Sequence, residues 1–350
     1  MGTDSVDQNV NRYHRQILLP QIGSDGQARL ARSRVMLVGC GALGTVMAEH
    51  LVRGGVGFLR LVDRDLVELT NLQRQTLFDE ADAAELTPKA IAAARRLSAI
   101  NSDVRIEPIV ANVDSGNIEK FAAVDLVLDG TDNVETRGLI NDVAVKHGLP
   151  WVYAACVGMT GRVMPIRPGE SGGPCLRCVF PELPTPAELP SCDTAGVFAP
   201  AAAIVASLAA AAAIKLLIGV EPANELTAVD VWTNRIRSIA VGDKPRPDCP
   251  VCGRREFAFL AGSAAQRTVS LCGQNAVQFR PGAGTAVDLE MLEAKLRHSG
   301  AIRRNAHLLR CELHAPAGVS LTVFPDGRAI VHGAAGETQA RSIYARFVGT

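Results

Sequence analysis

The stretch VMLVGCGALGTVMAEHL, residues 35–51, decides the fold class of this 350-residue chain. It opens with an apolar run typical of a buried strand and closes with a helical pattern, and Gly39, Gly41 and Gly44 stand between them. This spacing is that of the G-x-G-x-x-G turn, which binds the phosphates of a nucleotide at the start of a helix. Since NAD-dependent oxidoreductases also use such a turn, this stretch alone leaves the nucleotide open.

Strand-like and helical patterns alternate beyond this turn, which predicts βαβ units in an α/β fold with a Rossmann-like, doubly wound sheet. The expected strands are 35–39, 58–63, 104–110, 124–130 and 150–156, with helices over 43–54 and 88–100, and later strands at 161–166, 225–232 and 235–241 extend it as a mixed sheet. We expect three parts: an N-terminal helical arm at 1–33, a nucleotide-binding domain at 34–254, and a small C-terminal α+β domain at 255–350.

The C-terminal part carries patterns of its own. A strand-like segment at 269–279, a helix over 288–300, a hairpin at 321–333 with Asp326-Gly327 at its turn, and a last helix with an apolar face are expected. No spacing of residues in this part indicates catalysis, and we expect Cys272 and Cys311 to be core thiols.

Composition excludes several classes of protein. Lys plus Arg and Asp plus Glu number 36 each, so the whole chain has no electrostatic footprint for nucleic acid or an anionic membrane. The N-terminal residues lack the apolar stretch of a secretory signal, and we expect a cytoplasmic location. The alanine-rich segment 199–219 reads as a buried helix because it begins beside a proline and contains Lys215.

Four of the nine cysteines form two C-x-x-C pairs, PCLRC with Cys175 and Cys178, and DCPVCG with Cys249 and Cys252. Two such pairs can direct four thiolates at one tetrahedral ion, which predicts a closed, structural zinc site. Two unrelated turns, or one redox pair, are the alternatives.

The residues after the second expected strand favour ATP over a nicotinamide cofactor. Asp63 ends that strand, where a carboxylate binds ribose hydroxyls. A nicotinamide cofactor has only a pyrophosphate to neutralise, whereas a triphosphate needs several cations. We expect Arg74 and Lys89 to supply that charge, and Asp65, Asn71 and Gln75 to lie around the same ligand.

A second pair of carboxylates, Asp129 and Asp132, lies in DGTDN at the end of another expected strand. A carboxylate at this edge of the sheet could hold Mg²⁺ between phosphate oxygens. The alternative is a turn whose side chains cap the next helix. Given the surrounding motifs, we favour the magnesium role for Asp132.

The segments RYHRQILLPQIG, GCGALG, LVDRD, TNLQRQ, TPKA, DGTDN, GPCLRC, SCDTAGV and DCPVCG occur in this order over residues 12–253. Together they resemble the ThiF/MoeB/HesA family, the bacterial relatives of ubiquitin-activating enzymes. The resemblance implies an adenylyltransferase that uses ATP to activate the C-terminal glycine of a ubiquitin-like β-grasp sulfur carrier of the ThiS or MoaD type. It also implies a homodimer in which Arg15 reaches the ATP of the other subunit.

By the same resemblance, Asp63 binds ribose, Arg15, Asn71, Arg74 and Lys89 surround the phosphates, Asp132 coordinates magnesium, and the paired cysteines bind zinc. Cys192, in SCDTAG, matches a cysteine that takes up the activated carrier or its sulfur in some members and is dispensable in others. The C-terminal part has no rhodanese-like cysteine loop, so we expect a separate sulfur donor protein. An NAD-dependent oxidoreductase and an inactive nucleotide-binding scaffold are the alternatives.

Overall fold

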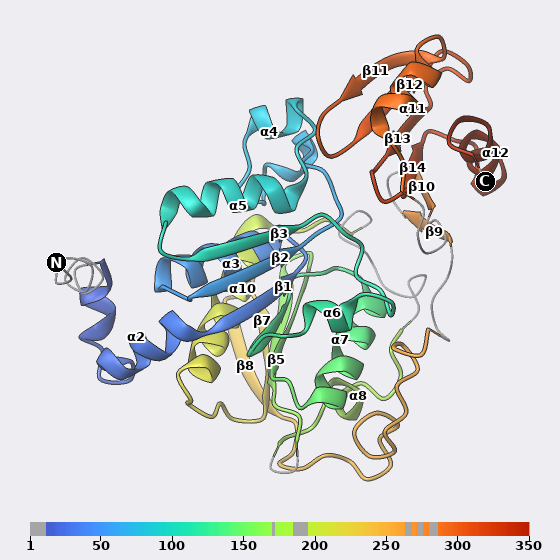
Figure 1. Ribbon diagram of the computed structural model, residues 1–350. Coiled ribbons are helices and arrows are strands. Elements are labelled where there is room, and N and C mark those ends of the chain that lie inside the picture. Colours follow the sequence, from blue (N-terminus) through green and yellow to red (C-terminus); the bar gives the residue numbers. More distant parts are fainter. Residues whose placement is uncertain are drawn as a thin grey trace. The chain divides into compact units, whose positions relative to one another are not determined.

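The computed structural model describes residues 12–169, 172–184, 195–262, 268–271, 276–279 and 286–349. The chain divides into two compact units, residues 1–264 and 265–350. Each unit has a β-sheet of its own (Figure 1).

The sheet of the first unit has eight strands in the order β3-β2-β1-β4-β5-β6-β7-β8. They are β1 Arg34–Val38, β2 Phe58–Val62, β3 Arg105–Ile109, β4 Leu126–Asp129, β5 Trp151–Val157, β6 Thr160–Ile166, β7 Glu225–Asp230 and β8 Arg235–Ala240. Strands β1 to β5 are parallel, and β6 to β8 continue the sheet in antiparallel fashion. The predicted doubly wound mixed sheet is therefore confirmed, and the carboxyl ends of the parallel strands meet at one edge.

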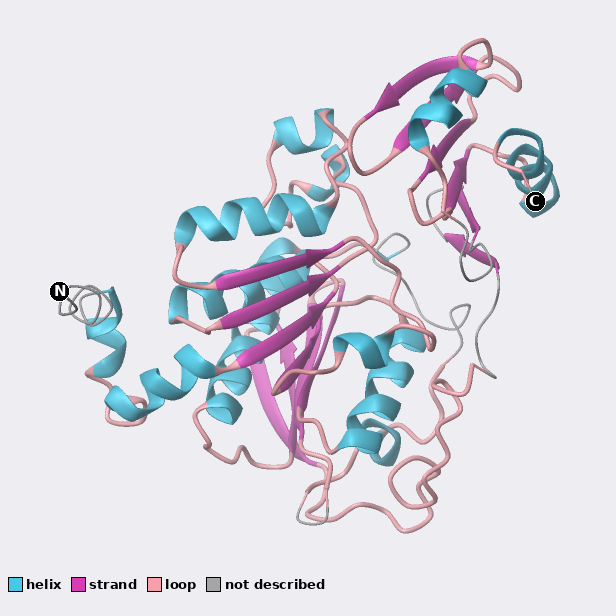
Figure 2. Ribbon diagram, in the orientation of Figure 1, coloured by secondary structure: helices cyan, strands magenta, loops and turns pink. Residues whose placement is uncertain are grey.

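Helices cover both faces of this sheet (Figure 2). One face carries α3 (Ala42–Gly54), α5 (Lys89–Ile100) and α10 (Ala199–Leu217), and the other carries α6 (Ile118–Phe121) and α7 (Val134–His147). Apolar side chains bury the two interfaces, with Met47, Leu61 and Val205 on the first face and Met36 and Trp151 on the second.

Helix α10 is the one helix, among the residues that the structure describes, with the length and apolar composition to cross a membrane. Small side chains such as Ala202, Ala206 and Ala209 are buried, so α10 lies close against α3 and the sheet. The alanine-rich segment thus packs as a core helix of this unit.

The N-terminal arm is helical over residues 12–17 and in α2 (Gly23–Arg32). Side-chain amides of Gln16 and Gln27 both donate to the carbonyl oxygen of Gly54, at 3.0 Å each. These bonds satisfy a carbonyl group at the end of α3 that the helix itself leaves without a partner. The arm is therefore fastened to the C-terminal end of α3.

Residues 255–262, which the sequence placed in the tail, pack against α7 of the first unit. The backbone N–H groups of Phe259 and Leu260 donate to Asp142 Oδ2 at 2.9 and 3.2 Å. A Cβ atom at Gly138 would lie only 2.6 Å from the Phe259 ring, so the ring occupies the space that this glycine leaves.

The second unit is an antiparallel sheet in the order β11-β12-β13-β14-β10-β9, with two helices over its apolar face. Its elements are β9 Thr268–Leu271, β10 Ala276–Phe279, α11 Leu289–Leu296, β11 Gly300–Arg304, β12 Leu309–Leu313, β13 Ser320–Val323, β14 Ala329–His332 and α12 Glu337–Phe347. Cys311 is fully buried, as predicted.

Three features of this unit differ from the sequence expectation. The segment 269–279 contains parts of two antiparallel strands, β9 and β10, rather than one. Strands β11 and β12 were not predicted. Strand β11 lies at the edge of the sheet and lacks a regular alternation of buried and exposed residues, whereas β12 has that alternation over only five residues. Helix α11 ends before Gly300, which begins β11.

Candidate nucleotide and metal sites

The glycine turn lies between β1 and α3, at the edge where the parallel strands end. A Cβ atom at Gly39, whose φ is +91°, would lie 2.8 Å from the carbonyl oxygen of Gly130, and one at Gly44 would lie 1.9 Å from that of Gly39. Gly39 is therefore required by the contact between the turn and the residue after β4, and Gly44 by the close approach of the turn to the start of α3. A Cβ atom at Gly41 would lie 3.9 Å from the carbonyl oxygen of Gly130, so this position leaves room for a ligand.

Asp63 follows β2 and joins the glycine turn to the next loop. Its Oδ2 accepts the backbone N–H of Cys40 at 2.6 Å, and its Oδ1 accepts that of Asp65 at 2.7 Å. Burial raises the pKa of Asp63, and the charge of Asp65 adds to this rise, while Lys89 and the two N–H donors oppose it. Because each carboxylate oxygen can accept a second hydrogen bond, Asp63 can still receive two ribose hydroxyls.

Lys89 is buried at the start of α5, where it lies beside Asp65. Its backbone N–H donates to the carbonyl oxygen of Asp65 at 2.9 Å, and its Nζ lies 3.3 Å from Asp65 Oδ2. Burial lowers the pKa of Lys89, but the charges of Asp65, Asp63 and Asp132 outweigh it and raise the pKa overall. The charges of three carboxylates thus act on the Lys89 ammonium group, and Arg64 Nε lies 3.6 Å from Asp65 Oδ1 as a second cation near the site.

The segment between these residues carries Asn71, Arg74 and Gln75, beginning with the short helix η1 (Leu69–Asn71). Asn71 Oδ1 accepts the backbone N–H of Glu68 at 3.1 Å, so only its amide nitrogen is suited to a phosphate. Arg74 is half-buried and donates to the carbonyl oxygen of Thr70 at 2.9 Å. Gln75 Oε1 is buried and has no hydrogen-bond partner in the described part of the chain, which favours a donor from a ligand here.

The two carboxylates of the DGTDN segment have different surroundings. Asp129 is fully buried, where Arg137 Nε lies 3.0 Å from its Oδ2 and the N–H and hydroxyl of Thr131 donate to its Oδ1. Burial raises the pKa of Asp129, and Arg137 opposes this rise. Asp132 is exposed and its charge acts on Lys89. Of the two, Asp132 is therefore the one open to a metal ion.

Arg15 lies away from these residues within its own chain. In the same helical turn, Tyr13 Oη accepts from Asn101 Nδ2 at 2.7 Å, and Gln16 donates to Gly54 at the last residue of α3. Since α3 has 13 residues, about 18 Å separate its two ends. The glycine turn is at the other end, so Arg15 lies about one helix length from it in its own chain.

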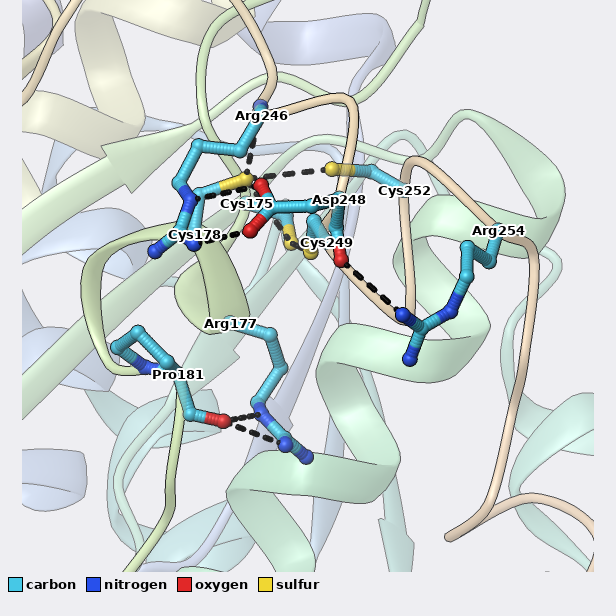
Figure 3. A network of polar contacts seen from close by, with 9 residues as sticks. All are labelled: Cys175, Arg177, Cys178, Pro181, Arg246, Asp248, Cys249, Cys252 and Arg254. Carbon is cyan, nitrogen blue, oxygen red and sulfur yellow. Dashed lines mark hydrogen bonds and ion pairs between the residues drawn. The ribbon is translucent and has the colours of Figure 1, made fainter.

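The four paired cysteines come together in space (Figure 3). Their sulfur atoms all lie within 4.8 Å of one another, with Cys175–Cys249 at 3.6 Å and Cys178–Cys252 at 3.3 Å. A tetrahedral zinc ion with Zn–S bonds of about 2.3 Å separates its sulfur ligands by about 3.8 Å. The donor set and its spacing therefore fit a closed, four-thiolate zinc site.

Two groups outside this cluster support it. The backbone N–H of Arg246 donates to Cys178 Sγ at 3.4 Å, and Asn141 Nδ2 lies 3.8 Å from Cys175 Sγ. Asn141 Oδ1 also accepts the N–H of Leu176 at 2.9 Å, which fixes the start of α8 (Leu176–Val179).

Sequence reasoning missed Gly130, Arg137 and Asn141. Two of these had a visible signal, because Gly130 lies within DGTDN and Arg137 follows it closely in DGTDNVETR. Cys192 and Cys272 lie outside the described residues, so their roles stay predictions.

Residues 13–251 match the ThiF family model. The chain belongs to the ThiF family. It is 41% identical over 342 residues to the sulfur carrier protein ThiS adenylyltransferase of Bacillus subtilis, an alignment that covers 97% of this chain and 100% of that protein. It is also 44% identical over 253 residues to the sulfur carrier protein adenylyltransferase of Thermus thermophilus, covering 70% of this chain and 92% of that one.

A solved structure shares the fold of the first unit. Escherichia coli MccB with ATP superposes with a TM-score of 0.60 and 27% identity, over 69% of this chain and 74% of that one. The alignment to the Bacillus subtilis protein also covers the second unit.

Proposed function

We propose that this ThiF family member adenylates the C-terminal glycine of a ubiquitin-like sulfur carrier of the ThiS or MoaD type. The observation that carries the proposal is the cluster of Asp63, Asp65, Lys89 and Asp132 beside the glycine turn. Relatives that align over most of this chain are named as sulfur carrier adenylyltransferases, which supports the same reaction.

The proposed reaction needs positioning and positive charge more than acid–base groups. The carrier's terminal carboxylate oxygen forms a bond to the α-phosphorus of ATP, and the bond between that phosphorus and the bridging oxygen breaks to release pyrophosphate. The attacking carboxylate is already ionised at neutral pH, so no general base is required. Lys89 and Arg74 stabilise the charge on the phosphates, and Asp63 holds the ribose.

Magnesium fits the same cluster. Asp65 Oδ2 lies 3.3 Å from Lys89 Nζ, and the charges of Asp63 and Asp132 also act on Lys89, so carboxylate oxygens, the ligands that Mg²⁺ prefers, are gathered at this edge of the sheet. We assign Asp132 as the residue that holds this ion, because Asp129 is committed to Arg137.

The position of Arg15 supports the proposed dimer. Because Arg15 is held about one helix length from its own glycine turn, it can act on ATP only in a second copy of the chain. We therefore propose a homodimer in which each subunit supplies Arg15 to the other.

The sulfur is proposed to come from a separate donor protein. Cys311, the one cysteine described in the second unit, is fully buried in the core and cannot reach a carrier. We propose Cys192 as the candidate thiol for an attack on the activated carrier. The family resemblance gives this role to the matching cysteine in some members.

We place the carrier against β8, the edge strand of the first sheet. Every residue of β8 is exposed, Ile236 is 61% exposed, and Trp232 in the preceding turn is 72% exposed. An unpaired edge strand with apolar side chains can accept a strand of a β-grasp protein.

Ile236→Glu is expected to raise the carrier concentration at half-maximal rate by about tenfold while leaving the ATP dependence unchanged. Steady-state kinetics with each substrate varied in turn measure this, and an unchanged carrier dependence contradicts the docking surface.

The cysteine cluster is proposed to hold a structural zinc ion supported by Asn141. Asn141→Ala removes the donor to Cys175 and the acceptor for Leu176, so it is expected to weaken zinc retention by about 10- to 100-fold. Competition with a coloured zinc chelator measures the affinity. Asn117→Ala, which alters a half-buried asparagine with local backbone hydrogen bonds, is the control and should leave the zinc affinity unchanged.

The proposed function is tested by magnesium-dependent exchange of labelled pyrophosphate into ATP. Each β-grasp protein of the same organism that ends in Gly-Gly is added in turn. Exchange that requires one carrier supports the proposal and names the pathway. Tight ATP binding by the protein without exchange for any carrier would overturn it.

A further inference from the structure

Arg137, on the second turn of α7, contacts both the DGTDN segment and β5. Its Nε lies 3.0 Å from Asp129 Oδ2, and its terminal nitrogen donates to the carbonyl oxygens of Thr131 at 2.6 Å and Ala154 at 3.3 Å. The guanidinium also lies 5.4 Å from the ring centroid of Tyr153. One side chain thus joins α7, the turn after β4, and β5.

These contacts fix the backbone on one side of Asp132. The N–H and hydroxyl of Thr131 donate to Asp129, and its carbonyl oxygen accepts from Arg137, so the residue before Asp132 is held at both ends. On the other side, Asn133 Oδ1 caps α7 by accepting the N–H of Thr136 at 3.1 Å. Asp132 is the exposed residue between two fixed neighbours.

The buried ion pair between Asp129 and Arg137 is better explained by a role in the nucleotide site than by stability. Asp129 is fully buried and the Arg137 side chain is 12% exposed, and a buried ion pair contributes little net stability because both charges lose their hydration. A planar guanidinium is the group that can bind a carboxylate and two carbonyl groups at once. The pair is therefore better explained by a requirement for fixed geometry.

We propose that Arg137 is a positioning residue that holds the Asp132 carboxylate where it binds magnesium. This rests on the proposed function, in which Asp132 holds the ion. Arg137 touches no substrate, and acts through the turn at Asp129 and Thr131. Arg137→Gln shortens the side chain and removes its charge, so the turn and Asp132 lose their fixed position.

The test is a double-mutant cycle between Arg137 and Asp132 in which the readout is the magnesium dependence of ATP binding, measured by calorimetry. Arg137→Gln is expected to raise the magnesium concentration at half-saturation by about 10- to 100-fold, as for other residues that orient metal ligands. Arg137→Lys should show a smaller rise. In an Asp132→Asn background, Arg137→Gln should add nothing further, because both changes remove one function.

Arg60→Gln is the matched control for lost packing. Arg60 is also 12% exposed and lies 2.6 Å from Glu107, but that pair joins β2 to β3 away from the DGTDN turn. It should lower thermal stability without changing the magnesium dependence. Additive effects of Arg137→Gln and Asp132→Asn would overturn the positioning role. If Asp132→Asn alone leaves the magnesium dependence intact, the metal assignment within the proposed function fails instead.

Discussion

Replacing Lys89 by methionine is expected to lower carrier-dependent pyrophosphate exchange by roughly 10³- to 10⁵-fold, the range found when a cation is removed from a transferring phosphate. Lys89 Nζ is the buried ammonium beside Asp65, and Asp63 and Asp132 also act on it. Without it, the phosphates lose one cation and the repulsion from the nearby carboxylates grows. Methionine keeps the length of the side chain, so the loss reports charge rather than a cavity. Arg74→Ala is expected to have an effect in the same range.

The control for this prediction is Lys146→Met. Lys146 lies near the end of α7, where it is 39% exposed and pairs with Glu119 at 2.9 Å. Its loss should leave exchange within the error of the assay. Exchange by Lys89→Met at more than a tenth of the normal rate would contradict the role assigned to the lysine.

The second large effect concerns Arg15. Arg15→Ala should lower exchange by roughly 10³-fold or more, because an arginine supplied in trans stabilises charge on the transferring phosphate. Co-expression of Arg15→Ala with Lys89→Met should then restore activity, since a mixed dimer contains one site with both residues intact. Random assortment gives mixed dimers in half of the cases, so about a quarter of the normal rate is expected.

Arg12→Ala is the control for the arm. Arg12 donates to the carbonyl oxygen of Ile100 at 3.1 Å and lies 3.7 Å from Asp103 of its own chain, so its loss should affect only the packing of the arm. Mixed dimers that stay inactive, despite normal dimer formation, would contradict the exchange of Arg15 between subunits.

The sequence was sufficient for the parts of the site that depend on local pattern. Asp63 was predicted because it ends a parallel strand, and Lys89 because a triphosphate needs several cations. In the structure the charge of Asp63 acts on Lys89, so the two lie in one region. The three glycines of the turn were also predicted, but only the structure shows that their roles differ. Gly39 and Gly44 are fixed by backbone contacts, and Gly41 faces open space.

Residues whose partners are distant in sequence could not be predicted. Asn141 is a polar residue inside a buried helix, and its partners Cys175 and Leu176 lie 34 and 35 positions further along the chain. Arg137 depends equally on β5, through Ala154 and Tyr153. A helix that is buried on both sides gives no polar face against which such residues stand out.

The most direct measurement of the central claim is the intact mass of the carrier after incubation with the protein, ATP and Mg²⁺. A carrier whose mass increases by one adenylate, with the increase located at its C-terminal glycine, is the predicted result. A carrier that lacks this glycine, and the Lys89→Met variant with the full-length carrier, should show no increase. An unmodified carrier under conditions where the protein binds both ATP and the carrier would contradict the adenylation that we propose.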